Sequence, residues 1–256
     1  MRTGRVLAPV IGVMVFLGAW EAFVRVFDVR KFVLRAPSTA VHRLWTGRAD
    51  FLPAAWTTVQ HSLIGLGVAL ALAVVVGAGL STSRFLEQAT QPVLTLVQVT
   101  PWFAYAGSVV VWLKSGTPPT LFLISLVCFP AYVFATIDGM RSVEPSTLEL
   151  LASVDASRWE TMRRLRLPAA APGLFTTSRF NFGLSLAAAY YMEGANFSNE
   201  GLGSIGKRSA ARPSTTDTMW AAVFAVALIG IGGLLLLTRL QRTVLHWHAA
   251  QRSQPS

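Results

Sequence analysis

Six long, mostly apolar segments constrain this chain more than any other feature. A helix that crosses a bilayer needs about 20 mostly apolar residues. Segments near that length lie at about 6–27, within 51–83, and at 88–113, 118–137, 172–192 and 218–238. With their connections they fill the chain of 256 residues. We therefore expect an all-α membrane protein with about six transmembrane helices. It would form one domain over residues 1–256, with a core at 51–241.

The composition supports this fold class and argues against a nucleic-acid-binding protein. Apolar residues make up 53% of the chain and charged residues 13%, against roughly 25% charged in soluble domains. The net charge is +10, which membrane proteins acquire when Lys and Arg flank their spans and meet anionic headgroups. Cys128, the single cysteine, lies in an apolar run and predicts a small buried hydrophobe. We expect no metal site, because His246 and His248 have no third ligand nearby.

Local patterns predict details of several spans. Glu21 and Arg25 are four residues apart, so they can pair on one helix face. Four glycines allow close helix packing in the second segment: Gly65, Gly67, Gly77 and Gly79. The uncharged stretch from Gln88 to Leu113 contains Pro92 and Pro101, which predicts a kinked or broken span. The first apolar segment is expected to be a retained span rather than a cleaved signal.

Charge alone does not orient the chain. If both termini lie on one side, eleven Lys and Arg residues fall on that side and ten on the other. The positive-inside rule needs a clear excess on one side. The orientation must therefore come from another feature.

The segment 138–168 is the most polar long connection between spans, and it predicts two short helices. Ser146 with Glu149, and Ser157 with Glu160, fit the capping box at a helix start. We expect helices at about 147–154 and 158–165, with Pro168 ending the second. Trp159, Met162 and Leu165 recur every three residues and would share one apolar face, and Glu160 can pair with Arg164. By itself, this pattern also fits a basic loop lying on the membrane surface.

The spacing within this segment resembles the signature loop of ABC-importer permeases. That family has Glu-Ala-Ala, three residues, Gly, nine residues and then Ile-x-Leu-Pro. Here Glu149-Leu150-Leu151 is followed by three residues, Asp155, nine residues and Leu165-Arg166-Leu167-Pro168. The resemblance extends to Pro37-Ser38, to Gln91-Pro92, and to Glu193 followed by Gly201-Leu202-Gly203. The most similar branch imports nitrate, sulfonates, taurine and related small solutes.

Three positions depart from the family pattern. Leu150 and Leu151 replace two small alanines, and their bulk could alter the fit to a partner. Asp155 replaces a glycine at the turn between the two helices. Asp tolerates a positive φ better than most residues, so we expect the turn to form.

The resemblance implies a function and a set of partners. The loop would be cytoplasmic and would dock on separate ABC ATPase subunits, which bind the ATP and magnesium, so this chain would bind no cofactor and perform no chemistry. An extracytoplasmic binding protein would deliver the solute to a permease homodimer. The chain would be a multi-pass protein of the bacterial plasma (inner) membrane, with both termini cytoplasmic. The implied coupling residues are Glu149, Leu150, Leu151, Asp155, Trp159, Met162, Leu165, Leu167 and Pro168.

A translocation path is harder to locate from the sequence. Charged groups in membrane helices are costly and often functional, which points to Arg179 and Glu193. Trp102, Phe103 and Trp112 are aromatic candidates. All five also fit packing or structural roles.

Three other functions remain open. The solute could be an osmolyte or amino acid, or the chain could be a channel or secondary transporter without an ATPase. An intramembrane enzyme would need paired catalytic groups within the spans, and no such pair is evident. Residues 201–208 nearly match a phosphate-binding loop, but Arg208 occupies the Ser or Thr position and the segment follows a membrane helix rather than a strand.

Overall fold

The predicted all-α fold is confirmed. The computed structural model of the protein describes residues 2–196 and 200–245, and these contain no β-strand. The α-helices are α1 (Arg2–Val26), α2 (Pro37–Thr46), α3 (Arg48–Ser81), α4 (Arg84–Val99), α5 (Ala106–Leu113), α6 (Thr117–Arg141), α7 (Pro145–Ser153), α8 (Arg158–Thr161), α9 (Leu167–Ala195), α10 (Gly201–Ala210) and α11 (Thr216–Val244). Short 3₁₀ helices precede α5 and α11, and a π-helical turn joins α8 to α9.

The core lies where α3, α6 and α9 pack together, and small residues bring these helices close. A Cβ on Gly65 would lie 2.6 Å from Ile124 Cγ2, and one on Gly77 would lie 2.7 Å from Thr136 Cβ. Both glycines are therefore required for the contact between α3 and α6. Gly67 and Gly79 face open space. Cys128 is fully buried in this core, as predicted.

In the described part of the chain, four helices are long and apolar enough to cross a membrane: Leu7–Val26, Arg48–Ser81, Thr117–Arg141 and Pro213–Val244. The predicted third span is broken, because α4 ends at Val99 and the chain turns at Thr100 and Pro101 before α5. The 29 residues of α9 are long enough to span, but the helix carries Ser178, Arg179, Asn181, Ser185 and Glu193. The count of six spans stays a prediction.

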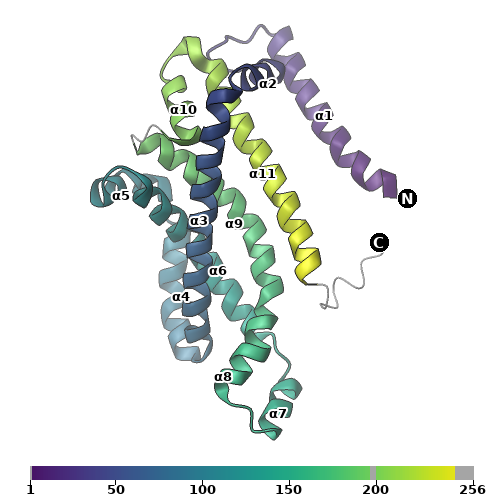
Figure 1. The fold of residues 1–256 in the computed structure, drawn as a ribbon, viewed down its shortest axis with the longest axis vertical. Helices are drawn as coiled ribbons and strands as arrows, with labels where there is room; N and C mark the ends of the chain where they lie inside the picture. The colour runs from purple at the N-terminus through teal and green to yellow at the C-terminus, as the bar shows by residue number, and fades with distance from the viewer. Residues whose placement is uncertain (1, 197–199, 246–256) are drawn as a thin grey trace.

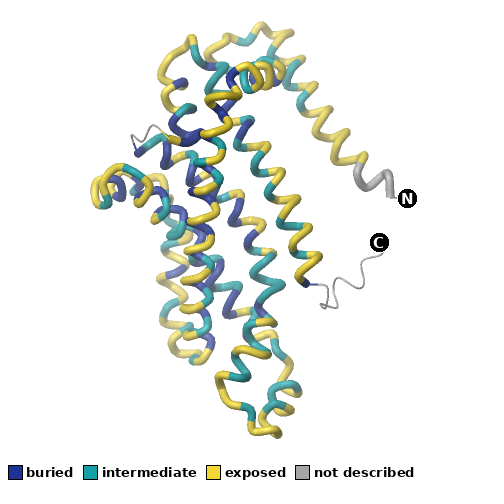
Figure 2. The backbone as a smooth tube through the Cα atoms, in the orientation of Figure 1, coloured by how far each residue is buried: buried dark blue, intermediate teal, exposed yellow. Residues whose placement is uncertain are grey.

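Helix α1 lies apart from the bundle, and most of its surface is exposed (Figure 2). It contacts α11 through Trp20, whose ring centroid is 5.4 Å from that of Trp220. The predicted pair of Glu21 and Arg25 forms, with Arg25 Nε donating to Glu21 Oε1 at 2.7 Å. Glu21 also accepts the backbone N–H of Ser38 at 3.0 Å, which ties the end of α1 to the start of α2.

The molecule is elongated, and its two ends differ (Figure 1). Helices α7 and α8 project from one end, whereas α2 and α10 lie at the other. Helix α9 begins near α8 and ends near α10, so it joins the two ends.

Candidate functional site

Helix α7 begins two residues before the predicted position, so its predicted capping box is wrong. Glu144 is the N-cap, Pro145 occupies the first turn, and no side chain caps the helix. Proline has the φ of a first helical residue and lacks the N–H that would be unsatisfied there. Ser146 therefore has helical geometry and cannot cap. Glu149 is exposed on this helix, with no capping role.

The capping box of α8 is confirmed. Glu160 N–H donates to Ser157 Oγ at 3.2 Å, and Ser157 N–H donates to Glu160 Oε2 at 3.0 Å. Glu160 also lies 3.8 Å from Arg164, as predicted. The hydrogen bond from the Ser157 backbone, with smaller effects from its hydroxyl and from Arg164, lowers the pKa of Glu160 below its ordinary value.

The turn between α7 and α8 uses a left-handed residue at the expected place. Asp155 has a φ of 52°. Its N–H donates to Ala152 O at 3.1 Å, and the next N–H, of Ala156, donates to Leu151 O at 3.1 Å. These bonds close the end of α7 in the way a C-terminal glycine usually does, so Asp155 preserves the turn.

Pro168 does not end the second helix of the loop, contrary to the prediction. A π-helical turn over Met162–Arg166 follows α8 and continues directly into α9. Proline lacks an N–H and clashes with the carbonyl four residues earlier. The wider π turn, in which Leu167 N–H bonds to Met162 O, accommodates it. The loop is therefore rigidly continuous with a core helix.

The apolar side chains of the loop divide into exposed and half-buried groups. Leu150 is 65% exposed and Trp159 is 68% exposed. Val154, which sequence reasoning missed, is 67% exposed. The others are half-buried: Leu151, Met162, Leu165 and Leu167. The tip thus presents three large apolar side chains, which is typical of a surface that binds a partner.

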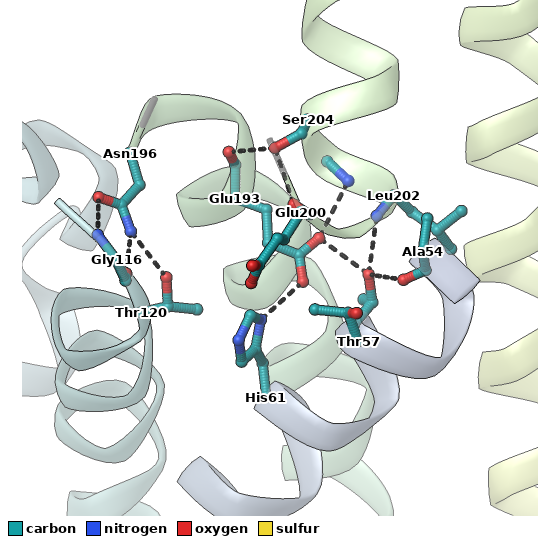
Figure 3. A network of polar contacts seen from close by, with 12 residues as sticks. Ala54, Thr57, His61, Gly116, Thr120, Glu193, Asn196, Glu200, Leu202 and Ser204 are labelled. Atoms are coloured by element: carbon teal, nitrogen blue, oxygen red, sulfur yellow. Dashed lines mark hydrogen bonds and ion pairs between the residues drawn. The ribbon is translucent and has the colours of Figure 1, made fainter. Parts of the chain in front are cut away.

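A second group of polar residues is buried at the other end of α9 (Figure 3). Glu193 is 1% exposed, and its carboxylate accepts the N–H of Gly203 at 3.0 Å and the hydroxyl of Thr58 at 2.8 Å. His61 Nδ1 lies 3.0 Å from the other carboxylate oxygen. Thr58 Oγ1 also accepts the N–H of Leu202 at 2.9 Å. This Glu193 network therefore joins α3 and α9 to the start of α10.

The glycines that nearly match a phosphate-binding loop allow α10 to pack closely against α9. Gly201 has a φ of +83°, and a Cβ there would lie 2.1 Å from the carboxyl carbon of Glu193. A Cβ on Gly203 would lie 1.8 Å from Tyr190 O. The pattern thus reflects the close contact of α10 with α9.

Asn196 fixes the end of α9 to a different element. Its amide nitrogen donates to Gly116 O, and its amide oxygen accepts the N–H of Gly116 at 3.1 Å. The turn between α5 and α6 is thereby held against α9 (Figure 3). Sequence reasoning identified neither Asn196 nor the partners Thr58 and His61.

The candidate path residues lie in three different environments. Arg179 is exposed near the middle of α9, and no ion pair with it forms within the described residues. It lies on an open face of α9 formed by Thr176, Arg179, Phe180, Gly183, Ala187 and Tyr191. Glu193, in contrast, is buried, and its carboxylate is engaged by Thr58, His61 and Gly203.

The aromatic candidates lie around the break between α4 and α5. Trp102 is half-buried, with its ring centroid 5.3 Å from that of Tyr191. Phe103 is 55% exposed, and its carbonyl accepts the Tyr191 hydroxyl at 3.4 Å. Both therefore adjoin the open face of α9. Trp112 is 69% exposed and packs edge-on against Phe122.

Long apolar helices, a broken span and a structured two-helix loop at one end are features expected of a transport permease. The profile of the family "Binding-protein-dependent transport system inner membrane component" matches residues 64–246. The chain therefore belongs to this family, and it is the permease component of an ABC importer.

Two relatives match nearly the whole chain. The formylaminopyrimidine transport permease protein ThiX of Halalkalibacterium halodurans is 25% identical over 254 residues, which cover 98% of this chain and 99% of the relative. The riboflavin transport system permease protein RibX of Chloroflexus aurantiacus is 28% identical over 248 residues, or 94% and 90% of the two chains.

Solved structures share the fold at low identity. A chain of the MetNI methionine ABC transporter in an inward-facing conformation has a TM-score of 0.65 and 15% identity, over 76% of this chain and 95% of the other. A chain of a bacterial ABC transporter that imports the polysaccharide alginate has a TM-score of 0.64 and 14% identity, over 95% and 96% of the two.

Proposed function

We propose that this permease couples ATP hydrolysis by separate ATPase subunits to alternating access, through docking of the loop formed by α7 and α8. One observation supports this most: the loop presents exposed Leu150, Val154 and Trp159 and continues without a break into α9. A force on the docked loop would thus reach the core helix directly.

Co-purification tests this docking. The variant Trp159→Ala should reduce the amount of ATPase that co-purifies with the permease by about tenfold, as expected for an aromatic anchor worth 1–2 kcal/mol. Trp45→Ala is the matched control, because Trp45 is 70% exposed on α2 at the opposite end. Equal ATPase recovery with both variants would contradict the proposal.

The open face of α9 supports a permease homodimer. Arg179 lies near the middle of this helix, where contact with lipid would be costly. Glu193, the one carboxylate on α9, is already engaged. A second copy of the chain would cover the face and enclose a polar path between the two copies.

The orientation follows from the docking. The end with α7 and α8 would face the cytoplasm together with both chain termini. The end with α2 and α10 would receive the extracytoplasmic solute-binding protein.

Two solute classes have support. Arg179 on the open face favours a small solute that carries an anionic group, such as nitrate, a sulfonate or taurine. Trp102, Phe103 and Tyr191 beside that face favour a planar heterocycle, as do the named solutes of ThiX and RibX.

Uptake into proteoliposomes with the ATPase and the binding protein separates the two solute classes. Uptake of taurine that falls with Arg179→Gln supports the anion, whereas uptake of formylaminopyrimidine or riboflavin alone supports the heterocycle. Uptake of an osmolyte or amino acid alone would contradict both.

A further inference from the structure

A cavity of about 350 Å³ lies at the end of the bundle that carries the loop. This open cavity is lined by the end of α3, the start of α4, the end of α6, α7 and the π-helical turn before α9. This volume is within the range of small-ligand sites, about 300–1,000 Å³. The lining residues are Ser81, Thr82, Arg84, Met140, Arg141, Val143, Leu148 and Arg166.

The lining is strongly basic. Arg84, Arg141 and Arg166 face the cavity, and no carboxylate is among its lining residues. A second cavity of about 360 Å³ shares Thr82 and Arg166 with the first and adds Arg158. Within the described residues, only Arg141 of the four has an ion-pair partner, Glu87. This arrangement attracts an anion.

Two features of these arginines also favour a negative group in the cavity. Arg166 Nε is buried and has no hydrogen-bond partner among the described residues, and an unsatisfied buried donor is costly. Arg84 is the first residue of α4, where a cation is unfavourable beside the positive end of the helix dipole. An anion in the cavity would satisfy the first and offset the second.

The surroundings favour a phospholipid as the source of this anion. Phe85, next to Arg84, is 77% exposed, and Leu86 is 47% exposed. These side chains could contact acyl chains while the arginines hold the headgroup. Basic pockets between transmembrane helices at their cytoplasmic ends commonly bind anionic headgroups.

We propose that this arginine cavity, lined by Arg84, Arg141 and Arg166, binds the phosphate of an anionic phospholipid. The site rests on the proposed function only in placing the loop end at the cytoplasmic leaflet. Arg84 supplies a charged donor at the membrane surface, and Arg166 supplies its free Nε–H from the π-helical turn. Because this turn joins the loop to α9, a bound lipid would stiffen the link between docking and transport.

Native mass spectrometry of the purified permease–ATPase complex tests the site. The complex would be titrated with phosphatidylglycerol, phosphatidylcholine or inorganic phosphate. We expect phosphatidylglycerol to bind at least tenfold more tightly than phosphatidylcholine. Arg84→Gln combined with Arg166→Gln should remove that preference. Arg239→Gln should keep it, because Arg239 is exposed on α11 and lines neither cavity.

The titration with inorganic phosphate distinguishes a lipid headgroup from free phosphate as the source of the anion. Displacement of phosphatidylglycerol by millimolar inorganic phosphate would support a shared phosphate site, and binding of inorganic phosphate alone would assign it to free phosphate. Equal binding of the two lipids without any phosphate binding would overturn the proposal. So would loss of ATPase from the double variant, since the arginines would then contact the ATPase. Co-purification of ATPase with the unaltered permease checks the proposed function separately.

Discussion

At the scale of single residues, Glu193 makes the most consequential contacts, because its buried carboxylate holds three helices. Replacement by Gln turns one acceptor oxygen into an NH₂ group, which faces either the Gly203 N–H and the Thr58 hydroxyl or His61 Nδ1. An unsatisfied buried group costs about 1–3 kcal/mol. We expect Glu193→Gln to lower the Tm of the purified permease by several degrees.

Glu200→Gln is the matched control for this loss of stability. Glu200 precedes α10, is exposed, and makes no capping bond with its side chain. Its replacement should leave Tm nearly unchanged. An equal fall in both variants would show that the buried contacts of Glu193 have no special weight.

Glu160 predicts a pH dependence of the loop. Its pKa is lowered in the folded loop, chiefly by the Ser157 backbone N–H. The ionised capping box therefore stabilises α8 fully above the ordinary pKa of Glu, about 4.3, and this stabilisation is lost as pH falls through the lowered value. Hydrogen exchange at 157–166, corrected for intrinsic rates, should accelerate in that acid range. Glu160→Gln should remove the acceleration, and an identical pH profile in the variant would refute the assignment.

At the scale of elements, the π-helical turn sets the angle between the loop and α9. Pro168→Ala restores an N–H and removes the ring clash, so the turn can relax to α-helix. Losing the extra residue of a π turn rotates α8 by about 100° relative to α9. We expect solute uptake to fall more than tenfold while the permease still inserts.

Pro172→Ala serves as the control for Pro168→Ala. Pro172 lies one turn further into α9, beyond the π-helical turn, so its replacement should retain most uptake. Full uptake by Pro168→Ala would show that the turn does not set a functional angle.

The same elements show which features the sequence could predict. Local patterns were sufficient to predict three features, because each depends on neighbouring residues. These are the capping box of Ser157, the left-handed conformation of Asp155 and the break in the span near Pro101. Pro145 at the first turn of α7 displaced the expected Ser146 cap, and the π-helical turn removed the expected stop at Pro168. The Glu193 network joins residues more than 130 positions apart, and the only local signal of it was the glycine spacing in α10.

At the scale of the whole molecule, α9 links the loop at one end to the Glu193 network at the other (Figure 1). Asn196 extends this link to the turn before α6, and Glu193 extends it to α3 and α10. If the loop docks as proposed, its movement would therefore reach the end with α2 and α10 through one continuous helix. In the proposed homodimer, a second copy would pack on the open face of α9.

Disulfide cross-linking tests that contact between copies. Ala187 is exposed on the open face of α9, and Cys128, the single native cysteine, is buried. A two-fold axis that passes through the open face brings residues near the axis close to their own counterparts, so Ala187→Cys should give a covalent dimer in oxidised membranes. Leu235→Cys, 60% exposed on α11, should remain monomeric, as should the unaltered chain. A dimer band from Leu235→Cys but not from Ala187→Cys would place the contact on α11 and leave Arg179 outside the path.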